Sequence, residues 1–534
     1  MTDSARSRRP TTSVTETSPA LFPFRVAAID VGSNAIRFLA AEFSDPNHWV
    51  ELANERLPIR MGHSTFLTGR LANEAMAAAV EAMASFRNSF DTLGIRGYRA
   101  VATSAVRESE NGGELVRRIR QETGIRLDTI AGSEEVRLVW LAARGRLDLR
   151  EGTWLLADLG GGSLELSLAD REGIHWSVSH QFGTVRLLED LGGPTTSPDR
   201  FRKLVSEYTN VLQLPRKLLK RTRVSGVVAT GGNAEILAHI VSAPVDAGGV
   251  RTMPIKALKD VARSLGAMSV SERMERFDLH EDRADVVFPA ALVYERVATL
   301  AEADELVIPG VGVKEGIVVD LVEDITGPAV HATRLEQQLL NAAVALGRRY
   351  RFDETHGRHV ARLSLSLFDQ LRGIHGLGAV DRKILLGAAL LHDIGQIVSY
   401  RRHHKHSLYL IYNSELPGVT SEETPMVALV ARYHRRAEPS DEHEHWNELE
   451  PDRRDRVRKL AAILRIADAL DREHLQRVER VKVQLDGGRV LLDPTGHGDL
   501  LLEQWAVSRK ARMFNSTFDL EVALLHAQRG PALI

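Results

Sequence analysis

Cysteine is absent from the chain, although the chain contains 534 residues. A protein without cysteine has no disulfide scaffold and no thiolate site for zinc or an iron–sulfur cluster. Any metal ion would therefore be held by histidine, aspartate, glutamate or water. Aromatic residues are also few, at 5%, whereas 43% hydrophobic and 26% charged residues are typical of a soluble globular protein. Because single cores rarely grow beyond roughly 300 residues, this length predicts three or more domains.

The sequence also lacks a charge excess and a long apolar run. Its 69 Lys and Arg residues nearly balance 71 Asp and Glu residues, which argues against a globally basic nucleic-acid binder. The most apolar uninterrupted stretch, 384–391, is much shorter than the roughly 20 residues of a membrane-spanning helix. Residues 1–23 are rich in Ser, Thr, Arg and Pro and have no apolar core of a signal peptide. We therefore expect a cytoplasmic protein with a disordered tail, no membrane partner and no specific nucleic-acid partner.

Two segments share one design, in which a β-type run ends at an aspartate and a glycine-containing tip leads into a second run. They are residues 25–43 and 153–169, which we interpret as an internal repeat of a hairpin. Helical patterns and further glycine turns alternate with these hairpins, the helices over 72–93 and 134–144 and the turns over 224–238 and 305–316. This alternation predicts an α/β architecture.

The pattern of the sequence changes after about residue 330, where helical periodicity and histidine-rich segments replace the strands. A Thr-Gly-Pro sequence at 326–328 marks the boundary. From residue 478 onward, two short strands around 486–488 predict a small α+β appendage. The predicted division is a disordered tail over 1–23, two α/β lobes over 24–148 and 149–328, a helical domain over 329–477 and the appendage over 478–534.

The two hairpin tips carry a pattern that suits an anion. In Asp30–Asn34 and in Asp158–Ser163 a carboxylate ends a strand, and the residues that follow supply short donors and accessible N–H groups. The turn alone would explain one such tip, but two copies with aspartate in register favour a phosphoryl group held between them. The carboxylates would repel phosphate, so we expect them to bind a hard cation such as Mg²⁺. Glu165, on the return strand, can reach the same ion.

Further motifs lie between and after these two tips along the chain. The full set is Asp30–Asn34, Thr103–Arg107, Gly132–Leu138, Asp158–Ser163, Ala229–Gly232 and Pro309–Gly316. The set resembles the exopolyphosphatase and guanosine pentaphosphate phosphohydrolase (Ppx/GppA) family, a branch of the actin-like, sugar kinase and Hsp70 ATPase superfamily. The resemblance covers about residues 25–325. It implies duplicated α/β lobes of the actin-like, RNase H-like fold over this range, and the patterns beyond it predict an all-α domain and then the α+β appendage.

The resemblance implies a role for each matching residue. Glu135 would be the catalytic base that orients water, and Arg107 would clamp phosphate with its planar guanidinium. Asp158 and Glu165 would bind Mg²⁺ or Mn²⁺, and Asp30 would assist at the metal or its water. The expected phosphate contacts are Ser33, Asn34, Gly160, Gly161, Gly162 and Ser163, with Thr230, Gly231 and Gly232 either contacting further phosphates or only packing. Outside these motifs, Glu135 would be interpreted as a solvated helix residue and Arg107 as part of a surface salt bridge.

The helical domain carries a second set of candidate ligands, His356, His392, Asp393 and Asp468. This set resembles the H…HD…D motif of HD-domain phosphohydrolases. His356 is preferred to His359 as the first ligand because His-x-x-x-Val-Ala is the usual family spacing. Two imidazoles and two carboxylates suit Mn²⁺, Fe²⁺, Mg²⁺ or Zn²⁺, so the resemblance implies a second divalent metal in an all-α HD-type domain. The alternative is that these helices serve only for dimerisation or for binding the polymer.

Positive charge gathers near this second set, in Arg348–Arg351, Arg401–His406 and Arg432–Arg436. Charge runs usually form a solvated face, but a polyphosphate chain, with one negative charge for each internal unit, would follow such a surface. We expect the histidines of these segments to be exposed and to add charge below a pH of about 6.5. The expected partners are inorganic polyphosphate and, within the family, guanosine pentaphosphate or tetraphosphate. The resemblance also implies a homodimer.

The leading hypothesis is a Mg²⁺-dependent exopolyphosphatase that releases orthophosphate from the end of inorganic polyphosphate, in a cleft between the lobes. A carboxylate base with Mg²⁺ suits hydrolysis of a terminal phosphoanhydride, and the GxxxxGK[ST] motif of P-loop NTPases does not occur. Conversion of guanosine pentaphosphate to tetraphosphate is a rival hypothesis, because both substrates end in the same anhydride. Two further hypotheses are a non-catalytic sensor of an alarmone or polyphosphate and independent nucleotide hydrolysis by the HD-type domain.

Overall fold

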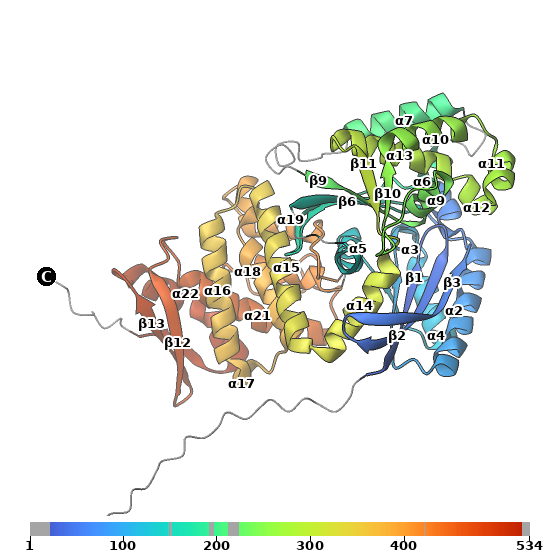
Figure 1. Ribbon diagram of the computed structural model, residues 1–534. Coiled ribbons are helices and arrows are strands. Elements are labelled where there is room, and N and C mark those ends of the chain that lie inside the picture. The colour runs from blue at the N-terminus through green and yellow to red at the C-terminus, as the bar shows by residue number, and fades with distance from the viewer. Residues whose placement is uncertain are drawn as a thin grey trace, which may run out of the picture.

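The computed structural model describes residues 22–147, 149, 152–191, 197–211, 224–420 and 422–525. The expected tail over 1–23 lies outside these ranges except for its last two residues. Figure 1 shows two α/β lobes on one side of the molecule and a helical region on the other, which ends in a small sheet. Within the described ranges, no helix is both long and apolar enough to cross a membrane.

The first lobe is built on a five-stranded sheet in the order β3-β2-β1-β4-β5. Its strands are β1 (Phe24–Val31), β2 (Ile36–Asp45), β3 (His48–Leu57), β4 (Gly97–Ala102) and β5 (Leu127–Thr129). The first three strands form an antiparallel meander, and β4 and β5 continue the sheet parallel to β1. All residues of β1 except Arg25 are buried, as expected for an apolar strand that is covered on both faces.

The second lobe repeats this plan in a six-stranded sheet with the order β10-β11-β9-β6-β7-β8. Its strands are β6 (Thr153–Leu159), β7 (Leu164–Ala169), β8 (Ile174–His180), β9 (Val224–Thr230), β10 (Arg251–Pro254) and β11 (Glu305–Ile308). Strands β6, β7 and β8 form the meander, β9 and β11 run parallel to β6, and β10 adds an antiparallel edge. The predicted internal repeat is confirmed. It extends to a third strand in each meander, β3 and β8.

Helices surround the two sheets. The first lobe contains α1 (Met61–Thr68), α2 (Asn73–Leu93), α3 (Ser104–Glu108), α4 (Gly112–Thr123) and α5 (Gly132–Arg146). The second contains α6 (Thr184–Asp190), α7 (Pro198–Val211), α9 (Gly232–Ile240), α10 (Ile255–Gly266), α11 (Val270–Phe277), α12 (Glu281–Ala284) and α13 (Val287–Leu300). The helices predicted over 72–93 and 134–144 are therefore confirmed. Helix α2 buries Met76, Met83 and Phe86 on one face and ends at Gly94, whose φ of 66° suits glycine.

One helix crosses back from the second sheet to the first. Helix α14 (Val313–Thr326) follows β11 in the chain but packs against β1. Its side chains Ile317 and Val322 share a core with Val26 of β1 and Leu138 of α5. The two lobes are thus linked by a returning helix, and α5 is enclosed between α14 and the second sheet.

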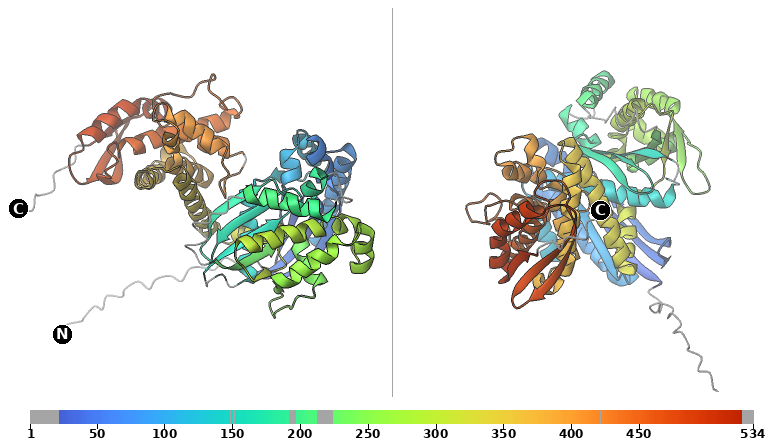
Figure 2. Two further views of the ribbon diagram at one scale, coloured as in Figure 1. Left: turned by 90° about the horizontal axis from the view of Figure 1, so that it is seen from above. Right: turned by 90° about the vertical axis from the view of Figure 1, so that its left-hand side faces the viewer.

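The helical region begins where Gly327 separates α14 from α15, at the position where the sequence predicts a boundary. Its elements are α15 (Pro328–Arg349), α16 (Glu354–Gln370), α17 (Arg372–His375), α18 (Ala379–Leu391), the short 3₁₀ helix η1 (Ile394–Ile397), α19 (His403–Tyr412), α20 (Thr424–Arg432) and α21 (Pro451–Ala469). They bury a common core that includes Leu385, Val427 and Ile463. Helix α15 packs beside β8 and joins this region to the lobes, as both views of Figure 2 illustrate.

The chain ends in the predicted α+β appendage. It consists of β12 (Val478–Asp486), β13 (Arg489–Gly496), α22 (Leu501–Phe518) and β14 (Glu521–Leu524), with the sheet order β12-β13-β14. The two strands predicted around 486–488 are confirmed. The side chain of Gln370 in α16 donates to the carbonyl of Val481 and accepts from the N–H of Val483, both at 2.9 Å. Because α22 also packs on α21, the appendage extends the core of the helical region.

Candidate active site

The candidate active site is a cavity of about 350 Å³ between the two lobes. Its wall is formed by both hairpin tips, residues of β3, the starts of α9 and α14, and two residues of α5. The predicted site residues in this wall are Asp30, Ser33, Asn34, Glu135, Asp158, Gly160, Gly161, Ser163, Gly231 and Gly232. The other predicted residues contact or adjoin residues of this wall, and they are Arg107, Gly162, Glu165 and Thr230. The structure therefore brings the predicted set together.

The two hairpin tips touch each other. A Cβ atom added to Gly161 would lie 3.1 Å from the Cβ of Ser33 and 3.5 Å from the backbone nitrogen of Asn34. A Cβ on Gly162 would lie only 2.4 Å from Oγ of Ser104, which is itself 2.8 Å from Oγ of Ser33. Larger side chains do not fit here, so glycine keeps the N–H groups of both tips close enough to share one anion.

The first tip also fastens the lobes to each other. The side-chain nitrogen of Asn34 donates to the backbone carbonyl of Asp282 in the second lobe at 2.8 Å. The carboxylate of Asp282 pairs with Arg56 of the first lobe, and Asp285 accepts from Arg60 at 2.6 Å. The side-chain amide of Asn34 therefore links the two lobes, in addition to lining the cavity.

Asp158 and Glu165 lie directly opposite each other on β6 and β7. Cross-strand neighbours point to the same face of a sheet, so two carboxylates adjoin in a buried site. Thr230 donates to Oδ1 of Asp158, and Ser179 donates to Oε1 of Glu165, each at 2.8 Å. Oε2 of Glu165 is buried and has no hydrogen-bond partner within the described part of the chain. An unpartnered carboxylate oxygen beside a second carboxylate fits a hard cation such as Mg²⁺ or Mn²⁺.

The first lobe carries an arginine at the position that corresponds to Glu165 in the second lobe. Asp30 and Arg37 face each other on β1 and β2, just as Asp158 and Glu165 do on β6 and β7. Nη1 of Arg37 donates to Oδ2 of Asp30 at 2.9 Å, and Arg37 lines the cavity. Sequence reasoning missed Arg37. The internal repeat contained the signal, because Arg37 follows Asp30 at the spacing by which Glu165 follows Asp158.

Glu135 is buried in the first turn of α5 and faces the cavity. Nη1 of Arg107 donates to Oε1 of Glu135 at 2.7 Å and to the carbonyl of Ile130 at 2.6 Å. Arg107 therefore holds the Glu135 carboxylate in place. Burial raises the pKa of Glu135 to about 7, while Arg107 opposes this rise and the charges of Asp158 and Asp30 add to it. A carboxylate with a pKa near 7 is suited to general base catalysis at neutral pH.

The other carboxylates of the cavity are also difficult to ionise. Burial raises the pKa values of Asp30, Asp158 and Glu165. For Glu165, the neighbouring charges of Glu135 and Asp158 raise the pKa further. Ionised side chains in this arrangement repel one another, and a bound dication would relieve that repulsion.

Glu134 precedes Glu135 in the sequence but belongs to a buried ion network. Its carboxylate accepts from Nε of Arg137 at 2.7 Å and from Nη2 of Arg99 at 2.8 Å. Asp320 of α14 accepts from the same two arginines at 2.8 and 3.0 Å. The network fastens α5 to α14 and β4, which fixes the position of Glu135 in the cavity wall. Of the two adjacent glutamates, the second is therefore the one that faces the cavity.

Further cations that the sequence analysis did not include line the cavity. They are Arg56, Arg146, Arg283 and Lys314. Lys314 lies inside the Pro309–Gly316 motif, whereas the three arginines lie outside the recognised motifs. A Cβ atom on Gly232 would lie 2.5 Å from Nη1 of Arg283, so glycine lets this guanidinium approach the turn before α9. Burial lowers the pKa of Arg283 to about 10, which leaves it charged at neutral pH.

The second predicted set comes together in the helical region. Nε2 of His356 lies 3.6 Å from Oδ1 of Asp468. Nε2 of His392 lies 3.8 Å from the same oxygen and 3.9 Å from Oδ2 of Asp393. Nδ1 of His359 contacts an arginine of its own helix instead. Of the two histidines considered for the first position, His356 is the one in the cluster.

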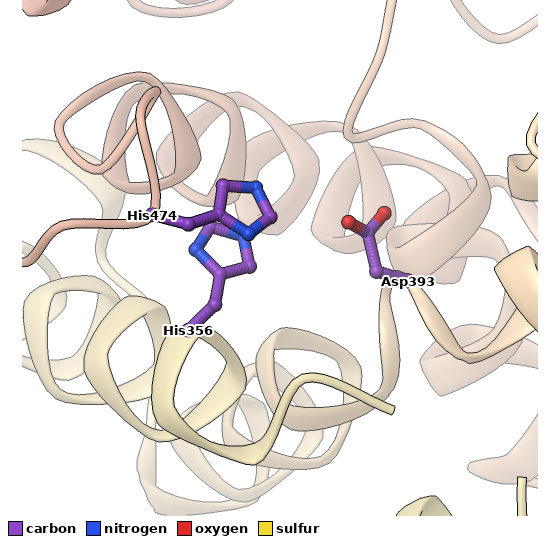
Figure 3. Close-up of side chains that lie close together, drawn as sticks. All are labelled: His356, Asp393 and His474. Atoms are coloured by element: carbon purple, nitrogen blue, oxygen red, sulfur yellow. The ribbon is translucent and has the colours of Figure 1, made fainter. Parts of the chain in front are cut away.

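His474 adds a ring that the sequence analysis did not include. Figure 3 shows the rings of His356 and His474 stacked, with Asp393 across from them. The ring centroids are 3.6 Å apart and the planes differ by 5°. Nδ1 of His474 lies 3.1 Å from Oδ2 of Asp353, which holds the ring in place. His474 belongs to no recognised motif, because it lies in the segment that connects α21 to β12.

Two histidines of the basic segments are buried, so the expectation that these histidines are exposed is wrong for them. His403 and His434 are 4% and 3% exposed and approach the carboxylate of Asp393. Helices α19 and α20 pack on each other and enclose the two rings. Burial lowers the pKa of His434 well below its usual range, so this ring is neutral at pH 7.

The comparison with known families agrees with the fold and the cavity. Residues 44–325, which include most of the two lobes, match the Ppx/GppA phosphatase family. The chain belongs to the Ppx/GppA phosphatase family. Residues 340–492 match domain III of Ppx/GppA phosphatases, so the helical region is also part of the family's architecture. The HD-type identity of this region stays a prediction.

Individual Ppx/GppA relatives match little more than half of the chain. Exopolyphosphatase 1 of Mycobacterium leprae is 27% identical over 300 residues, which are 55% of this chain and 88% of the relative. The crystal structure of an exopolyphosphatase from Cytophaga hutchinsonii is 23% identical, with a TM-score of 0.53, and covers 56% of this chain and 98% of its own. An exopolyphosphatase-like protein of known structure is 28% identical, with a TM-score of 0.50, and covers 56% and 97%. The predicted actin-like fold of the lobes is therefore confirmed.

Proposed function

We propose that the protein is a divalent-metal-dependent exopolyphosphatase, which hydrolyses the terminal phosphoanhydride of inorganic polyphosphate and releases orthophosphate. One observation carries the proposal: two opposed glycine tips and a buried glutamate with a pKa of about 7 share one cavity. Membership of the Ppx/GppA phosphatase family and the similarity to exopolyphosphatase 1 support the same activity.

The hairpin tips would bind the terminal phosphate. N–H groups of Gly161 and Gly162 and the hydroxyls of Ser33 and Ser163 would donate to its oxygens, in the manner of other glycine-rich anion sites. Gly231 and Gly232 also line the cavity and would contact the next phosphates. Thr230 has an indirect role, since its hydroxyl orients Asp158.

Glu135 would act as the general base. Its carboxylate accepts a proton from a water molecule while the water oxygen bonds to the terminal phosphorus. The bridging P–O bond breaks, and the shortened chain leaves with the electron pair. Arg107 keeps the base in position, and phosphoryl transfer of this kind depends mainly on such positioning and on charge neutralisation.

A hard divalent cation, Mg²⁺ or Mn²⁺, fits the residues of the cavity. Asp158 and Glu165 would hold it, and Asp30 would assist from the opposite tip. When bound, the ion neutralises charge on the terminal phosphate. Support comes from the unpartnered Oε2 of Glu165 and from the raised pKa values of the buried carboxylates.

The remaining phosphates of the chain would meet cations along the wall, namely Arg37, Arg56, Arg146, Arg283 and Lys314. Clustered positive charge at a cavity attracts a polyanion and raises its local concentration. This charge favours a polymer of phosphates over a substrate with a single phosphate group. A homodimer and a cytoplasmic location stay predictions.

Phosphate release from two substrates tests the proposal. Long-chain polyphosphate and guanosine pentaphosphate would be compared on one preparation of the full chain, with Mg²⁺ or Mn²⁺ and with EDTA. We expect faster release from polyphosphate and no release from either substrate in EDTA. Release from guanosine pentaphosphate alone would contradict the assignment of the substrate. Binding of either ligand without release, in the presence of both ions, would identify a sensor.

A further inference from the structure

The described part of the helical region contains three groups of metal-type ligands, and two of them, which have no residue in common, adjoin at Asp393. In the first cluster, ligand atoms of His356, His392 and Asp468 lie within 4.8 Å of one another. In the second cluster, the same limit encloses ligand atoms of Asp393, His403 and His434. A single ion held by His356, His392, Asp393 and Asp468 would leave the second pair of imidazoles unexplained.

The tautomers of these histidines follow from their hydrogen bonds. Nδ1 of His392 lies 2.8 Å from the carbonyl of Ala389. Nδ1 of His403 and Nδ1 of His434 likewise lie 3.0 and 2.6 Å from backbone carbonyls. A carbonyl only accepts, so each Nδ1 carries a hydrogen, and Nε2 is the ring atom left to bind a metal ion. Nδ1 of His356 faces Asp471 at 2.8 Å, an arrangement common behind metal-binding imidazoles.

The Nε2 atoms of each pair point at each other. They are 3.3 Å apart between His356 and His392, and 3.2 Å apart between His403 and His434. Two lone pairs at this separation repel unless a proton or a metal ion lies between or beside them. Ligand atoms bonded at about 2.1 Å to one ion lie about 3 to 3.6 Å apart, so both pairs have the spacing of ligands to a shared ion.

Asp393 presents one oxygen to each cluster. Its Oδ2 lies 3.9 Å from Nε2 of His392 in the first cluster. Its Oδ1 lies 3.0 and 3.4 Å from Nε2 of His403 and His434 in the second. Oδ1 is also buried and, within the described ranges, has no partner at hydrogen-bond geometry. This is the arrangement of a carboxylate that bridges two cations.

We propose that the helical region holds two divalent transition-metal ions bridged by the carboxylate of Asp393. His356, His392 and Asp468 bind the first ion, and His403 and His434 bind the second. Four imidazole ligands favour Mn²⁺, Fe²⁺ or Zn²⁺ over Mg²⁺, which prefers oxygen. This inference does not depend on the function proposed for the cavity between the lobes.

The appendage closes one side of this centre. Lys510 of α22 pairs with Oδ2 of Asp468, which leaves Oδ1 directed at the imidazoles of the first cluster. On the open side, His474 covers the ring of His356 and is 36% exposed. The ions would therefore exchange with solvent past His474. The appendage would therefore have a structural role, because Lys510 orients Asp468, a ligand of the first ion.

Metal content and electron paramagnetic resonance of the full chain test the proposal. The protein would carry Asp158→Asn and Glu165→Gln, which remove the carboxylates of the cavity, and would be loaded with Mn²⁺ and then washed with Mg²⁺ buffer. We expect two Mn²⁺ ions per chain and the spectrum of a spin-coupled pair. His434→Ala should retain one ion and give the spectrum of isolated Mn²⁺. His406→Ala, one turn after His403 on α19, is the matched control and should retain the coupled pair.

Other results would overturn the proposal. Retention of one ion or none by the parent protein would exclude the two-ion centre. A proton shared between the two Nε2 atoms of a pair would then explain their short separation. Retention of the coupled pair by His434→Ala would exclude the second site. If circular dichroism shows that His434→Ala does not fold, the isosteric variant Asp393→Asn would be measured instead. If Asp393 bridges the two ions, this variant must lose the spin coupling between them.

Discussion

The cavity between the lobes and the centre of the helical region are both buried clusters of ionisable side chains, but they present different atoms. The cavity brings together carboxylate oxygens from Asp30, Glu135, Asp158 and Glu165. The helical centre brings together imidazole nitrogens with two aspartates. Oxygen ligands suit Mg²⁺, whereas imidazoles suit transition metals. With both proposed sites, the chain would separate two kinds of ion by the donor atoms of its two regions, without any cysteine.

The two regions also differ in how the fold assembles them. In the cavity, Asp158 and Glu165 are paired by the register of one hairpin. In the helical centre, the candidate ligands lie in or next to the terminal turns of α16, α18, α19, α20 and α21. The first arrangement is local in the sequence, and the second depends on how several helices pack.

The comparison would fail most clearly if the carboxylates of the cavity were dispensable for hydrolysis. Glu135→Gln keeps the shape of the side chain and removes the base, so we expect phosphate release from polyphosphate to fall by about 10² to 10⁴-fold. Binding of polyphosphate should persist, because the tips and the cations are unchanged. Initial rates and a binding assay measure the two effects. Glu122→Gln, on the exposed face of α4, is the control and should leave the rate unchanged.

The second prediction concerns the buried ion network that holds α5 against α14 and β4. Arg137→Met would remove one of the two guanidinium groups that Glu134 and Asp320 share in a buried site, so we expect the free energy of unfolding to fall by about 3 to 5 kcal/mol. Urea titration with fluorescence detection measures this change. Arg118→Met removes an exposed ion pair on α4 and should cost less than about 1 kcal/mol. Similar losses in the two variants would show that the buried network does not fix α5.

The third prediction concerns pH and the metal-free cavity. The pKa of Glu135 is about 7 in the folded protein against a usual 4.5, so the folded state holds this proton more tightly than the unfolded state. Protonation of Glu135 therefore stabilises the folded state. This contribution is complete below about pH 4.5, the pKa in the unfolded chain, and is lost as the pH rises through about 7. In EDTA, wild type should lose about 1 to 3 kcal/mol relative to Glu135→Gln between pH 5 and pH 8. Added Mg²⁺ should restore it, and a difference independent of pH would contradict the prediction.

The smallest expected effect lies where the two regions meet. Oε2 of Glu415, between α19 and α20, accepts from the N–H of Ser133 at the start of α5 at 2.9 Å. A carboxylate at a helix N-terminus contributes about 0.3 to 1 kcal/mol, so Glu415→Gln should lower the stability by that amount. The metal content of the helical centre should stay unchanged, with the exposed Glu444→Gln as control. Loss of bound ions would show that the two regions are not independent.

Much of the cavity could be predicted from the sequence because its residues lie in short motifs on hairpins. The alternation of strand residues places Asp158 and Glu165 on one face, and the repeat places Asp30 at the opposing tip. Arg37 is harder to predict because the two copies of the repeat differ on their return strands, where one carries Arg37 and the other Glu165. The return of α14 to the first sheet is a packing result that no local pattern encodes.

The helical centre could be predicted only in part. The motif led to His356 and His392, but His403 and His434 lie in basic segments whose composition suggests a solvated face. Their burial depends on the packing of α19 on α20, which the sequence does not show. The contact between Lys510 and Asp468 likewise depends on the docking of the appendage.

One assay tests the division of labour between the two regions most directly. Mg²⁺-dependent phosphate release from long-chain polyphosphate would be measured for wild type, for Asp158→Asn with Glu165→Gln, and for His392→Asn with Asp393→Asn. We expect the first double variant to lose at least about a hundredfold in rate, because it removes the predicted ion ligands. The second should stay within about twofold of wild type, since its residues belong to the other centre. Loss of release in the second double variant, with retention in the first, would place the hydrolysis in the helical region and contradict the proposed function of the cavity.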